Sequence, residues 1–255
     1  MSRMIAVRSM LSTMVVTFLL PQVACSHRTP VATVEVIDTS LSITPRAEKA
    51  ALDAVQDQIA RMQREDRLVL IPITGDAAND TGGHVLRLSA PTQRETYDTD
   101  LRRFHEQARK QWIAWISSLD PYQSRTDILG ALDVAQQELV LLPKESSPRV
   151  IIVSDFLEDD GTYRFVSAGE LATPEHGRQF GAQLREQRGF KLPPVLLCLG
   201  RLESTDFAPL SKQRREAVDA FWAAYFAAGR EHAEIQFDGT GILANGDRGC
   251  SWGKP

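Results

Sequence analysis

The chain contains 255 residues, 43% of them hydrophobic, and its formal net charge at pH 7 is −4. An acidic chain that also lacks a run of Lys and Arg is not expected to bind nucleic acid. The hydrophobic content is sufficient for a packed core, and neither an internal repeat nor a low-complexity tract is visible.

The N-terminus has the composition of an export signal. Arg3 and Arg8 precede the apolar run "MLSTMVVTFLL", which is too short to span a bilayer, and the sequence "PQVACS" follows it. We therefore predict a signal peptide at residues 1–24 and export to the periplasm or the cell envelope. The segment also resembles a bacterial lipoprotein signal, which implies that Cys25 carries a lipid and that residues 25–30 form a tether. Simple cleavage at the same small residues is the alternative and would release a periplasmic protein.

Apolar strands and amphipathic helices alternate along the rest of the chain. The first strand is the β-branched run at residues 31–37, and Pro45 then opens a helix at 45–66 whose apolar residues recur at helical spacing. The strands at 67–74 and 84–90 are separated by the turn-forming "GDAANDTGG" and are close enough to form a hairpin. Further elements are expected as helices at 94–119 and 127–142, a strand at 149–156, a helix at 174–188, a strand at 194–200, a helix at 212–231 and a strand at 233–239.

This alternation predicts an α/β fold with a doubly wound, mostly parallel sheet, helices on both faces and one antiparallel edge hairpin. In such sheets, ligands bind beyond the carboxyl ends of the strands. Asp38, Ser40 and Ser42 follow the first strand, and Asp155 lies at the end of a later one. We therefore expect these oxygen-bearing side chains to face a common crevice.

Together with Thr126, these residues form a set of oxygen donors without His or Cys. Such a set suits Mg²⁺, Mn²⁺ or Ca²⁺ rather than Zn²⁺. In an extended chain, alternate residues point the same way, so Asp38, Ser40 and Ser42 could converge on one ion. A cation there would meet at most two formal negative charges and could accept a further anionic ligand.

The same residues resemble the metal-ion-dependent adhesion site of von Willebrand factor A (VWA) domains. That family carries D-x-S-x-S after its first strand, a Thr in a later loop and an Asp after its fourth strand. Here "DTSLS", "TDILGAL" and "IIVSDF" provide the corresponding Asp38, Ser40, Ser42, Thr126 and Asp155. Phe156 departs from the pattern, because Gly commonly follows that Asp.

The resemblance implies a non-enzymatic, protein-binding function. Ser40, Ser42 and Thr126 would contact Mg²⁺ or Mn²⁺ directly or through water, while the two aspartates would supply charge. An Asp or Glu of a partner protein would complete the coordination, so metal and partner would bind together. The membrane would be contacted only through the lipid anchor.

The predicted domain organisation is a single VWA-like domain at residues 31–240 and an irregular tail at 241–255. Cys198, within "PVLLCLG", and Cys250, in the tail, could form a disulfide in an oxidising compartment. Cys198 could equally be a buried thiol, because the sequence does not give the separation of the two Cα atoms.

Two alternatives to the metal-dependent adhesion site remain open. Asp38, Ser40 and Ser42 are good N-cap residues, and Thr126 is the predicted N-cap of the helix at 127–142, so these oxygens could cap helices without binding metal. The alternative function is a metal-dependent phosphatase of the haloacid-dehalogenase type, suggested by the strand-terminal aspartate and the acidic "SDFLEDD". Such an enzyme needs a second Asp as general acid, and Ser40, at that position, cannot serve as an acid at neutral pH.

Overall fold

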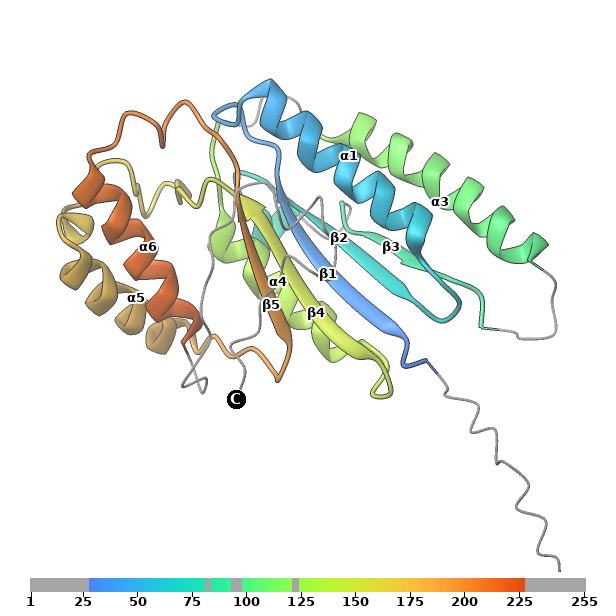
Figure 1. Ribbon diagram of the computed structural model, residues 1–255. Coiled ribbons are helices and arrows are strands. Elements are labelled where there is room, and N and C mark those ends of the chain that lie inside the picture. Colours follow the sequence, from blue (N-terminus) through green and yellow to red (C-terminus); the bar gives the residue numbers. More distant parts are fainter. Residues whose placement is uncertain (1–27, 81–83, 93–97, 121–123, 228–255) are drawn as a thin grey trace, which may run out of the picture.

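The structure is a computed structural model that describes residues 28–80, 84–92, 98–120 and 124–227 (Figure 1). Its central sheet has the strand order β3-β2-β1-β4-β5. The strands are β1 (Val31–Asp38), β2 (Arg67–Ile73), β3 (Leu86–Ser89), β4 (Ser147–Ser154) and β5 (Leu196–Arg201). All neighbouring strands pair in parallel except β3, which is antiparallel to β2. The predicted fold class, including its antiparallel edge hairpin, is confirmed.

Helices cover both faces of this sheet (Figure 1). The helices are α1 (Pro45–Arg61), the short α2 (Ala77–Asp80), α3 (Thr99–Ser118), α4 (Ile128–Val140), α5 (Pro174–Arg188) and α6 (Lys212–Phe226), with a 3₁₀ turn η2 (Gly169–Leu171). α1 and α3 share a hydrophobic core with one face, whereas α4, α5 and α6 share a core with the other. None of the described helices has the length and apolar character needed to cross a membrane.

The central strand β1 is buried towards both helix layers. Val34 and Val36 lie in the core that contains α4 and α6, while Ile37 lies in the core that contains α1 and α3. Alternate residues of a strand point to opposite faces, so a strand covered on both sides reads as a nearly continuous apolar run. This placement brings the end of β1 to the middle of the carboxyl edge of the sheet.

Side-chain caps begin the helices next to that edge. The hydroxyl of Thr44 accepts a hydrogen bond from the backbone N–H of Ala47 (3.4 Å) and begins α1 one residue before Pro45. Ser211 accepts from the N–H of Arg214 (3.2 Å) and begins α6. Because a cap satisfies an otherwise unpaired N–H, it fixes where the preceding loop must end.

The close packing of α5 on α6 depends on two glycines one helical turn apart. A Cβ at Gly177 would lie 2.2 Å from the carbonyl oxygen of Ala217, and a Cβ at Gly181 would lie 2.2 Å from that of Phe221. No side chain larger than hydrogen fits at either position without moving the helices apart.

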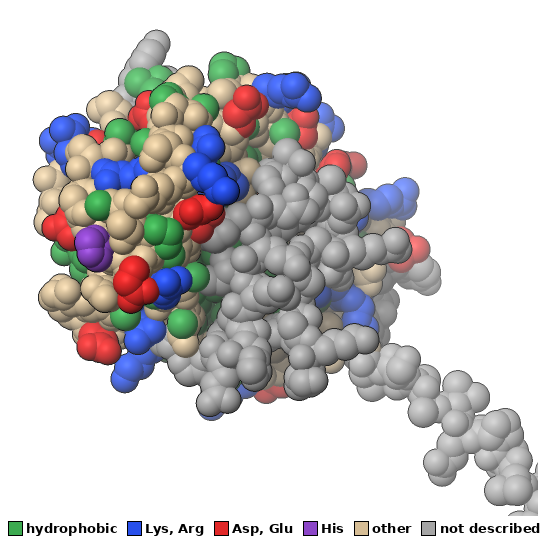
Figure 2. Space-filling view, turned by 60° about the vertical axis from the view of Figure 1, so that its left-hand side comes forward, with side chains coloured by type: hydrophobic (Ala, Val, Ile, Leu, Met, Phe, Trp, Pro, Cys, Tyr) green, Lys and Arg blue, Asp and Glu red, His purple; other side chains and the backbone are tan. Residues whose placement is uncertain are grey.

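On the described surface on this side of the molecule, Lys and Arg side chains are interspersed with Asp and Glu (Figure 2).

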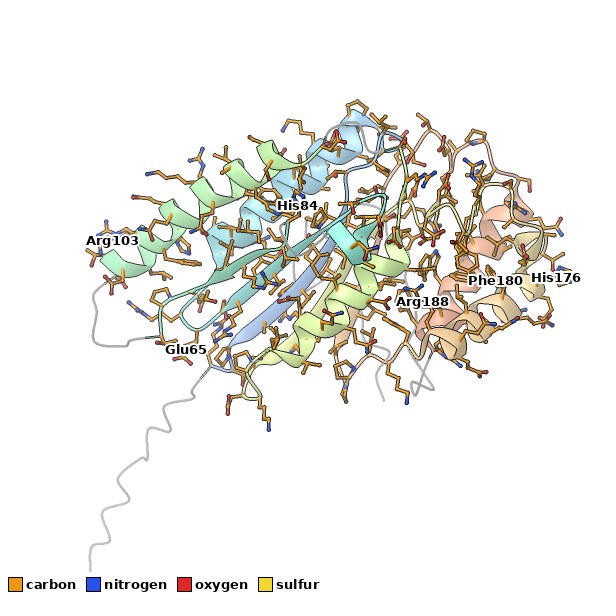
Figure 3. All side chains as sticks on the ribbon, turned by 180° about the vertical axis from the view of Figure 1, so that it is seen from behind. Glu65, His84, Arg103, His176, Phe180 and Arg188 are labelled. Carbon is orange, nitrogen blue, oxygen red and sulfur yellow. The ribbon has the colours of Figure 1, made fainter. Side chains whose placement is uncertain are left out.

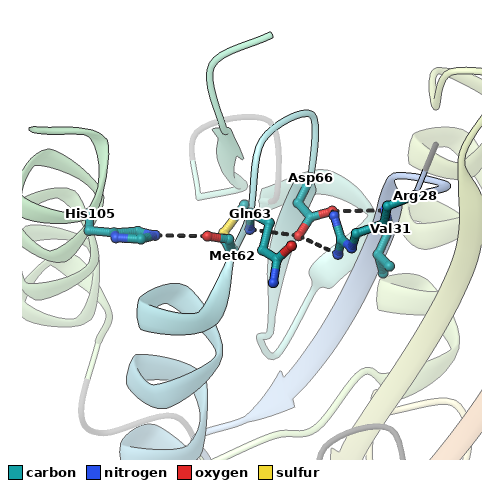
Figure 4. A network of polar contacts seen from close by, with 6 residues as sticks. All are labelled: Arg28, Val31, Met62, Gln63, Asp66 and His105. Atoms are coloured by element: carbon teal, nitrogen blue, oxygen red, sulfur yellow. Dashed lines mark hydrogen bonds and ion pairs between the residues drawn. The ribbon is translucent and has the colours of Figure 1, made fainter. Parts of the chain in front are cut away.

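A buried carboxylate ties the start of β1 to the connection between α1 and β2 (Figure 4). The two oxygens of Asp66 accept from the guanidinium of Arg28 (2.8 and 3.0 Å), from the N–H of Val31 (2.9 Å) and from the N–H of Gln63 (2.8 Å). The predicted helix at 45–66 therefore ends early, at Arg61, because these residues form a polar turn instead of a further helical turn.

The start of α4 differs from the prediction by one residue. Thr126 is not the N-cap; the carboxylate of Asp127 caps the helix by accepting from the N–H of Gly130 (2.6 Å). Both residue types are good caps, but the backbone of Thr126 is taken up by two hydrogen bonds with Asp159 (3.1 and 2.9 Å). The prediction at this position was therefore wrong.

Several predictions fall on residues that the structure does not describe. These are the signal peptide at 1–24, Cys25 with most of its tether, the strand at 233–239, the tail at 241–255 and Cys250. Cys198 in β5 is buried and disulfide-bonded. Its pairing with Cys250 stays a prediction.

Candidate metal centre

The carboxyl ends of β1 and β4 bring two aspartates together. β1 and β4 are neighbouring parallel strands in which Ile37 lies opposite Val153, so Asp38 and Ser154 end the two strands side by side. Asp155 follows directly after β4. Because parallel strands end at the same edge, residues far apart in sequence meet here.

Hydrogen bonds link four of the five predicted metal ligands into one chain. The carboxylate of Asp38 accepts from the N–H of Ser40 (2.9 Å), and the hydroxyls of Ser40 and Ser42 lie 3.0 Å apart. The Ser42 hydroxyl then donates to Asp155 (3.3 Å). A hydroxyl from β4, that of Ser154, donates to the other oxygen of Asp38 (2.6 Å).

The loop after β1 reaches this arrangement by turning and not as an extended chain. The N–H of Ile43 bonds back to the carbonyl of Ser40 (3.1 Å), which closes a turn over the DTSLS motif. The loop is held on its other side by the residues after β5, since Thr205 donates its N–H to the carbonyl of Ser42 (2.8 Å) and Ile43 pairs with Ser204. The convergence of the oxygens is therefore a tertiary effect.

The two aspartates are buried side by side, and burial away from water disfavours the charged form of each carboxyl. Asp38 is 0% exposed and Asp155 is 1% exposed. Burial, followed by the negative charge of Asp38, raises the pKa of Asp155 to about 7, although hydrogen bonds from Ser204, Leu157 and Ser42 oppose the shift. Burial likewise raises the pKa of Asp38, against hydrogen bonds from Ser154 and Ser40. A divalent cation would relieve both penalties, so this donor set fits a hard metal ion.

The fifth predicted ligand, Thr126, lies at the same edge of the sheet. The next residue, Asp127, donates its N–H to the carbonyl of Thr74 (2.9 Å), which directly follows β2, and Thr126 itself is paired with the loop after β4. Its side chain is buried. No hydrogen bond among the described residues joins its hydroxyl to the other four, so its role as a ligand stays a prediction.

Phe156 keeps the backbone conformation that glycine favours at this position. Its φ is 65°, in the left-handed region. A residue with a Cβ is strained there by about 1 kcal/mol or more. The strain is offset by burial: the ring lies edge-on to that of Trp222 at 5.9 Å, and the Phe156 carbonyl accepts from the indole N–H (2.9 Å). The loop can thus retain the shape of a glycine-containing loop.

Replacing Phe156 should separate its packing from its strain. We expect Phe156→Ala to lower the free energy of unfolding by about 4 kcal/mol through loss of packing. Phe156→Gly should be less damaging than Phe156→Ala by about 1 kcal/mol, because glycine relieves the positive φ. Urea unfolding measures both. At Phe221, inside α6, the control substitutions Phe221→Ala and Phe221→Gly should give the opposite order, with the Gly variant less stable than the Ala variant. The same order at both positions would contradict the proposed backbone strain at Phe156.

Sequence reasoning missed several polar residues at this edge. Ser154 and Ser204 each donate to an aspartate of the site. Ser154 lies within the quoted "IIVSDF" but was given no role there, and Ser204 belongs to no motif. A second acidic group is formed by Asp127, Glu158 and Asp160. Only Glu158 and Asp160 stand in the acidic string "SDFLEDD", whereas Asp127 comes from the start of α4. The available signal was the position of Ser154 at a strand end beside Asp38, which requires the strand order to interpret.

Comparisons with known proteins gave matches only among solved structures. No family model matches the chain, and no curated protein matches it. Matching structures include an aerotolerance-related membrane protein from Bacteroides fragilis NCTC 9343 (12% identity, 68% of this chain and 67% of that chain, TM-score 0.37). They also include the manganese-loaded Plasmodium vivax TRAP protein (14% identity, 85% and 71%, TM-score 0.41). A third is a von Willebrand factor type A protein from Catenulispora acidiphila (15% identity, 77% and 42%, TM-score 0.39). Because these TM-scores are all below 0.5, the fold class rests on the strand order and pairing described above.

Proposed function

We propose that this chain is a divalent-cation-dependent protein-binding module of the VWA type that is exported to the cell envelope. One observation carries the proposal: Asp38, Ser40, Ser42 and Asp155 form a continuous hydrogen-bonded group where β1 and β4 end. Helix capping does not explain these residues, because Thr44 caps α1 and Asp127 caps α4, and it does not account for two buried carboxylates placed side by side.

The proposed ion is Mg²⁺, with Mn²⁺ and Ca²⁺ as chemically similar alternatives. Ser40 and Ser42 would offer neutral hydroxyl oxygens, and Asp38 and Asp155 would offer the charge. Thr126, which lies at the same edge of the sheet, would add a third hydroxyl. Two carboxylates balance the charge of the ion without exceeding it, so the ion can still attract an anionic oxygen from outside.

An Asp or Glu of a partner protein would supply that outside oxygen. The surface beside the site suits such a contact, because Leu41, between the two serines, is 56% exposed and could be buried by a partner. A cavity of about 100 Å³ opens next to Thr39, lined also by Thr74 and His84. The partner would therefore contact the metal, the apolar tip of the loop and this cavity.

The remaining parts of the proposal concern location. Export through the signal at 1–24 and lipidation of Cys25 would hold the domain at the membrane by a short tether. A disulfide between Cys198 and Cys250 would suit the oxidising compartment.

The phosphatase alternative is disfavoured by the same geometry. Ser40 occupies the position of the general acid, and its hydroxyl lies against that of Ser42. A serine hydroxyl does not donate a proton to a leaving group at neutral pH. We therefore propose a binding function without catalysis.

The test is metal-dependent capture of partners by the mature chain from the envelope fraction of its own cells. Proteins retained in Mg²⁺ should be lost in EDTA and lost again with Asp38→Asn, because the ion bridges the two proteins. Asp53→Asn is the matched control, since Asp53 lies on the exposed side of α1 and pairs only with Lys49 in the described structure. Capture that persists in EDTA would contradict the proposal.

A further inference from the structure

A second group of carboxylates lies between the start of α4 and the loop after β4. Asp127, Glu158 and Asp160 each present an oxygen within 4.8 Å of the oxygens of the other two. The two segments that carry them are joined by the paired backbones of Thr126 and Asp159 (3.1 and 2.9 Å). The three side chains are therefore held together by the fold.

Backbone N–H groups fix the orientation of all three carboxylates. The pairs are Asp127 with Gly130 (2.6 Å), Glu158 with Leu129 (3.0 Å), and Asp160 with Thr162 and Tyr163 (2.6 and 2.7 Å). Carboxylates held in this way need little reorganisation to bind an ion.

The second observation is an unpaired oxygen inside the group. Glu158 is 0% exposed, and its Oε1 atom has no hydrogen-bond partner among the described residues. Burial raises the pKa of Glu158 well above its usual value, and the negative charges of Asp127 and Asp160 raise it further. A buried carboxyl oxygen beside two other carboxylates must take up either a proton or a cation.

Two neighbouring basic side chains, Arg188 and Arg164, pair with other carboxylates. Arg188, at the end of α5, reaches towards α4 (Figure 3), where its guanidinium pairs with Asp133. Its charge lowers the pKa of Glu158, but this is the smallest of the named influences. Arg164 pairs with Asp159 instead (3.3 Å). No salt bridge among the described residues involves the three clustered carboxylates.

We propose that Asp127, Glu158 and Asp160 bind a second divalent cation, and that this cation is calcium. Three carboxylates without His or Cys form a hard, strongly charged donor set. Mg²⁺ keeps several waters, for which a fully buried Glu158 leaves little room, whereas Ca²⁺ sheds its waters readily. The ion would also fix the two segments that carry Thr126 and Asp155, so it would help to hold the adhesion site in shape.

The experiment is calorimetric titration of Ca²⁺ into the mature chain and its variants. Asp38→Asn removes the first site, and Glu158→Gln removes a ligand of the second while keeping an acceptor for the N–H of Leu129. We expect D38N to retain one saturable site, and D38N/E158Q to bind at least about tenfold more weakly. If Glu158 is held protonated in place of an ion, both variants will behave alike, and the proposal is overturned.

Thermal unfolding shows whether each variant is folded. In EDTA, E158Q should unfold at or above the wild-type temperature, because a neutral amide replaces a buried acid. At a Ca²⁺ concentration that saturates D38N, its melting temperature should rise by about 5 °C, and that of D38N/E158Q should rise clearly less. Asp160→Asn, at the outer end of the group, is the second variant and should also reduce the shift. Failure of the adhesion site would appear differently, as equal binding stoichiometry in wild type and D38N.

Discussion

Replacing Asp38 by asparagine should abolish Mg²⁺ and Mn²⁺ binding at the end of β1 and leave the metal-free chain at least as stable as wild type. Asparagine keeps the shape of the side chain and can still accept the N–H of Ser40 (2.9 Å). It removes, however, one of only two formal charges that the ion would meet. Affinity should therefore fall by about 100-fold or more.

The expected stability of the metal-free variant follows from the charge of Asp38 itself. In the metal-free chain that charge raises the pKa of Asp155, and burial raises the pKa of both carboxyls. Removing it should bring the pKa of Asp155 down towards its usual value. The free energy of unfolding in EDTA should then equal or exceed that of wild type by about 1 kcal/mol.

Titration calorimetry and thermal unfolding with and without Mg²⁺ give both readouts. Wild type should gain stability on adding Mg²⁺, D38N should not, and Asp53→Asn should behave as wild type. If D38N binds Mg²⁺ as tightly as wild type, Asp38 is a cap for the loop and not a ligand. If D38N is much less stable in EDTA, the hydrogen bond that Ser154 donates to Asp38 in the wild type outweighs the repulsion between the two carboxylates.

Periodicity and strand-end chemistry account for what was predictable. Helix α1 shows its buried stripe of Ala51, Val55 and Ile59 directly in the sequence, because these residues recur every four positions and so lie on one face of a helix. The hairpin of β2 and β3 followed from two apolar runs with turn residues between them. That Asp38 and Asp155 meet follows from the rule that parallel strands end at one edge.

The rest of the site depends on contacts between distant segments. The turn over Ser40 and Ser42 forms because the loop after β5 pairs with it, and Ser204 reaches Asp155 from that same loop. Asp127 and not Thr126 caps α4 because the backbone of Thr126 pairs with that of Asp159, far along the chain. No local pattern encodes such partners, since each of these residues would be acceptable in an ordinary loop or cap.

Glu35 is the residue for which an apolar-strand reading of β1 fails most clearly. It lies in the middle of the central strand, opposite Leu70 on β2 and Ile151 on β4, and is 0% exposed. Neither of its carboxyl oxygens has a hydrogen-bond partner among the described residues. Burial raises its pKa from 4.5 to about 8. Cys198, opposite Ile151 on β5, is disulfide-bonded and does not titrate.

Replacing Glu35 by glutamine should therefore stabilise the chain in a pH-dependent way. Because the pKa is higher in the folded chain, folded Glu35 holds a proton that the unfolded chain releases between pH 4.5 and about 8. The stabilising contribution of this bound proton to the free energy of unfolding is fully present below pH 4.5 and is lost as the pH rises towards 8. Glutamine is neutral throughout, so E35Q should match wild type at pH 4.5 and exceed it by about 3 kcal/mol at pH 7.

Urea unfolding of both proteins in EDTA at pH 4.5, 7 and 8.5 measures the difference. Asp155, which titrates near pH 7, is present in both chains, and its contribution cancels in the comparison. The advantage of E35Q should grow from pH 4.5 to 8.5 and then level off, since above the folded pKa neither state of the wild type binds the proton. A constant difference across this range would mean that Glu35 ionises normally in the folded chain. The middle of β1 would then have to stabilise a full negative charge, which an apolar strand between two helix layers cannot do without a partner.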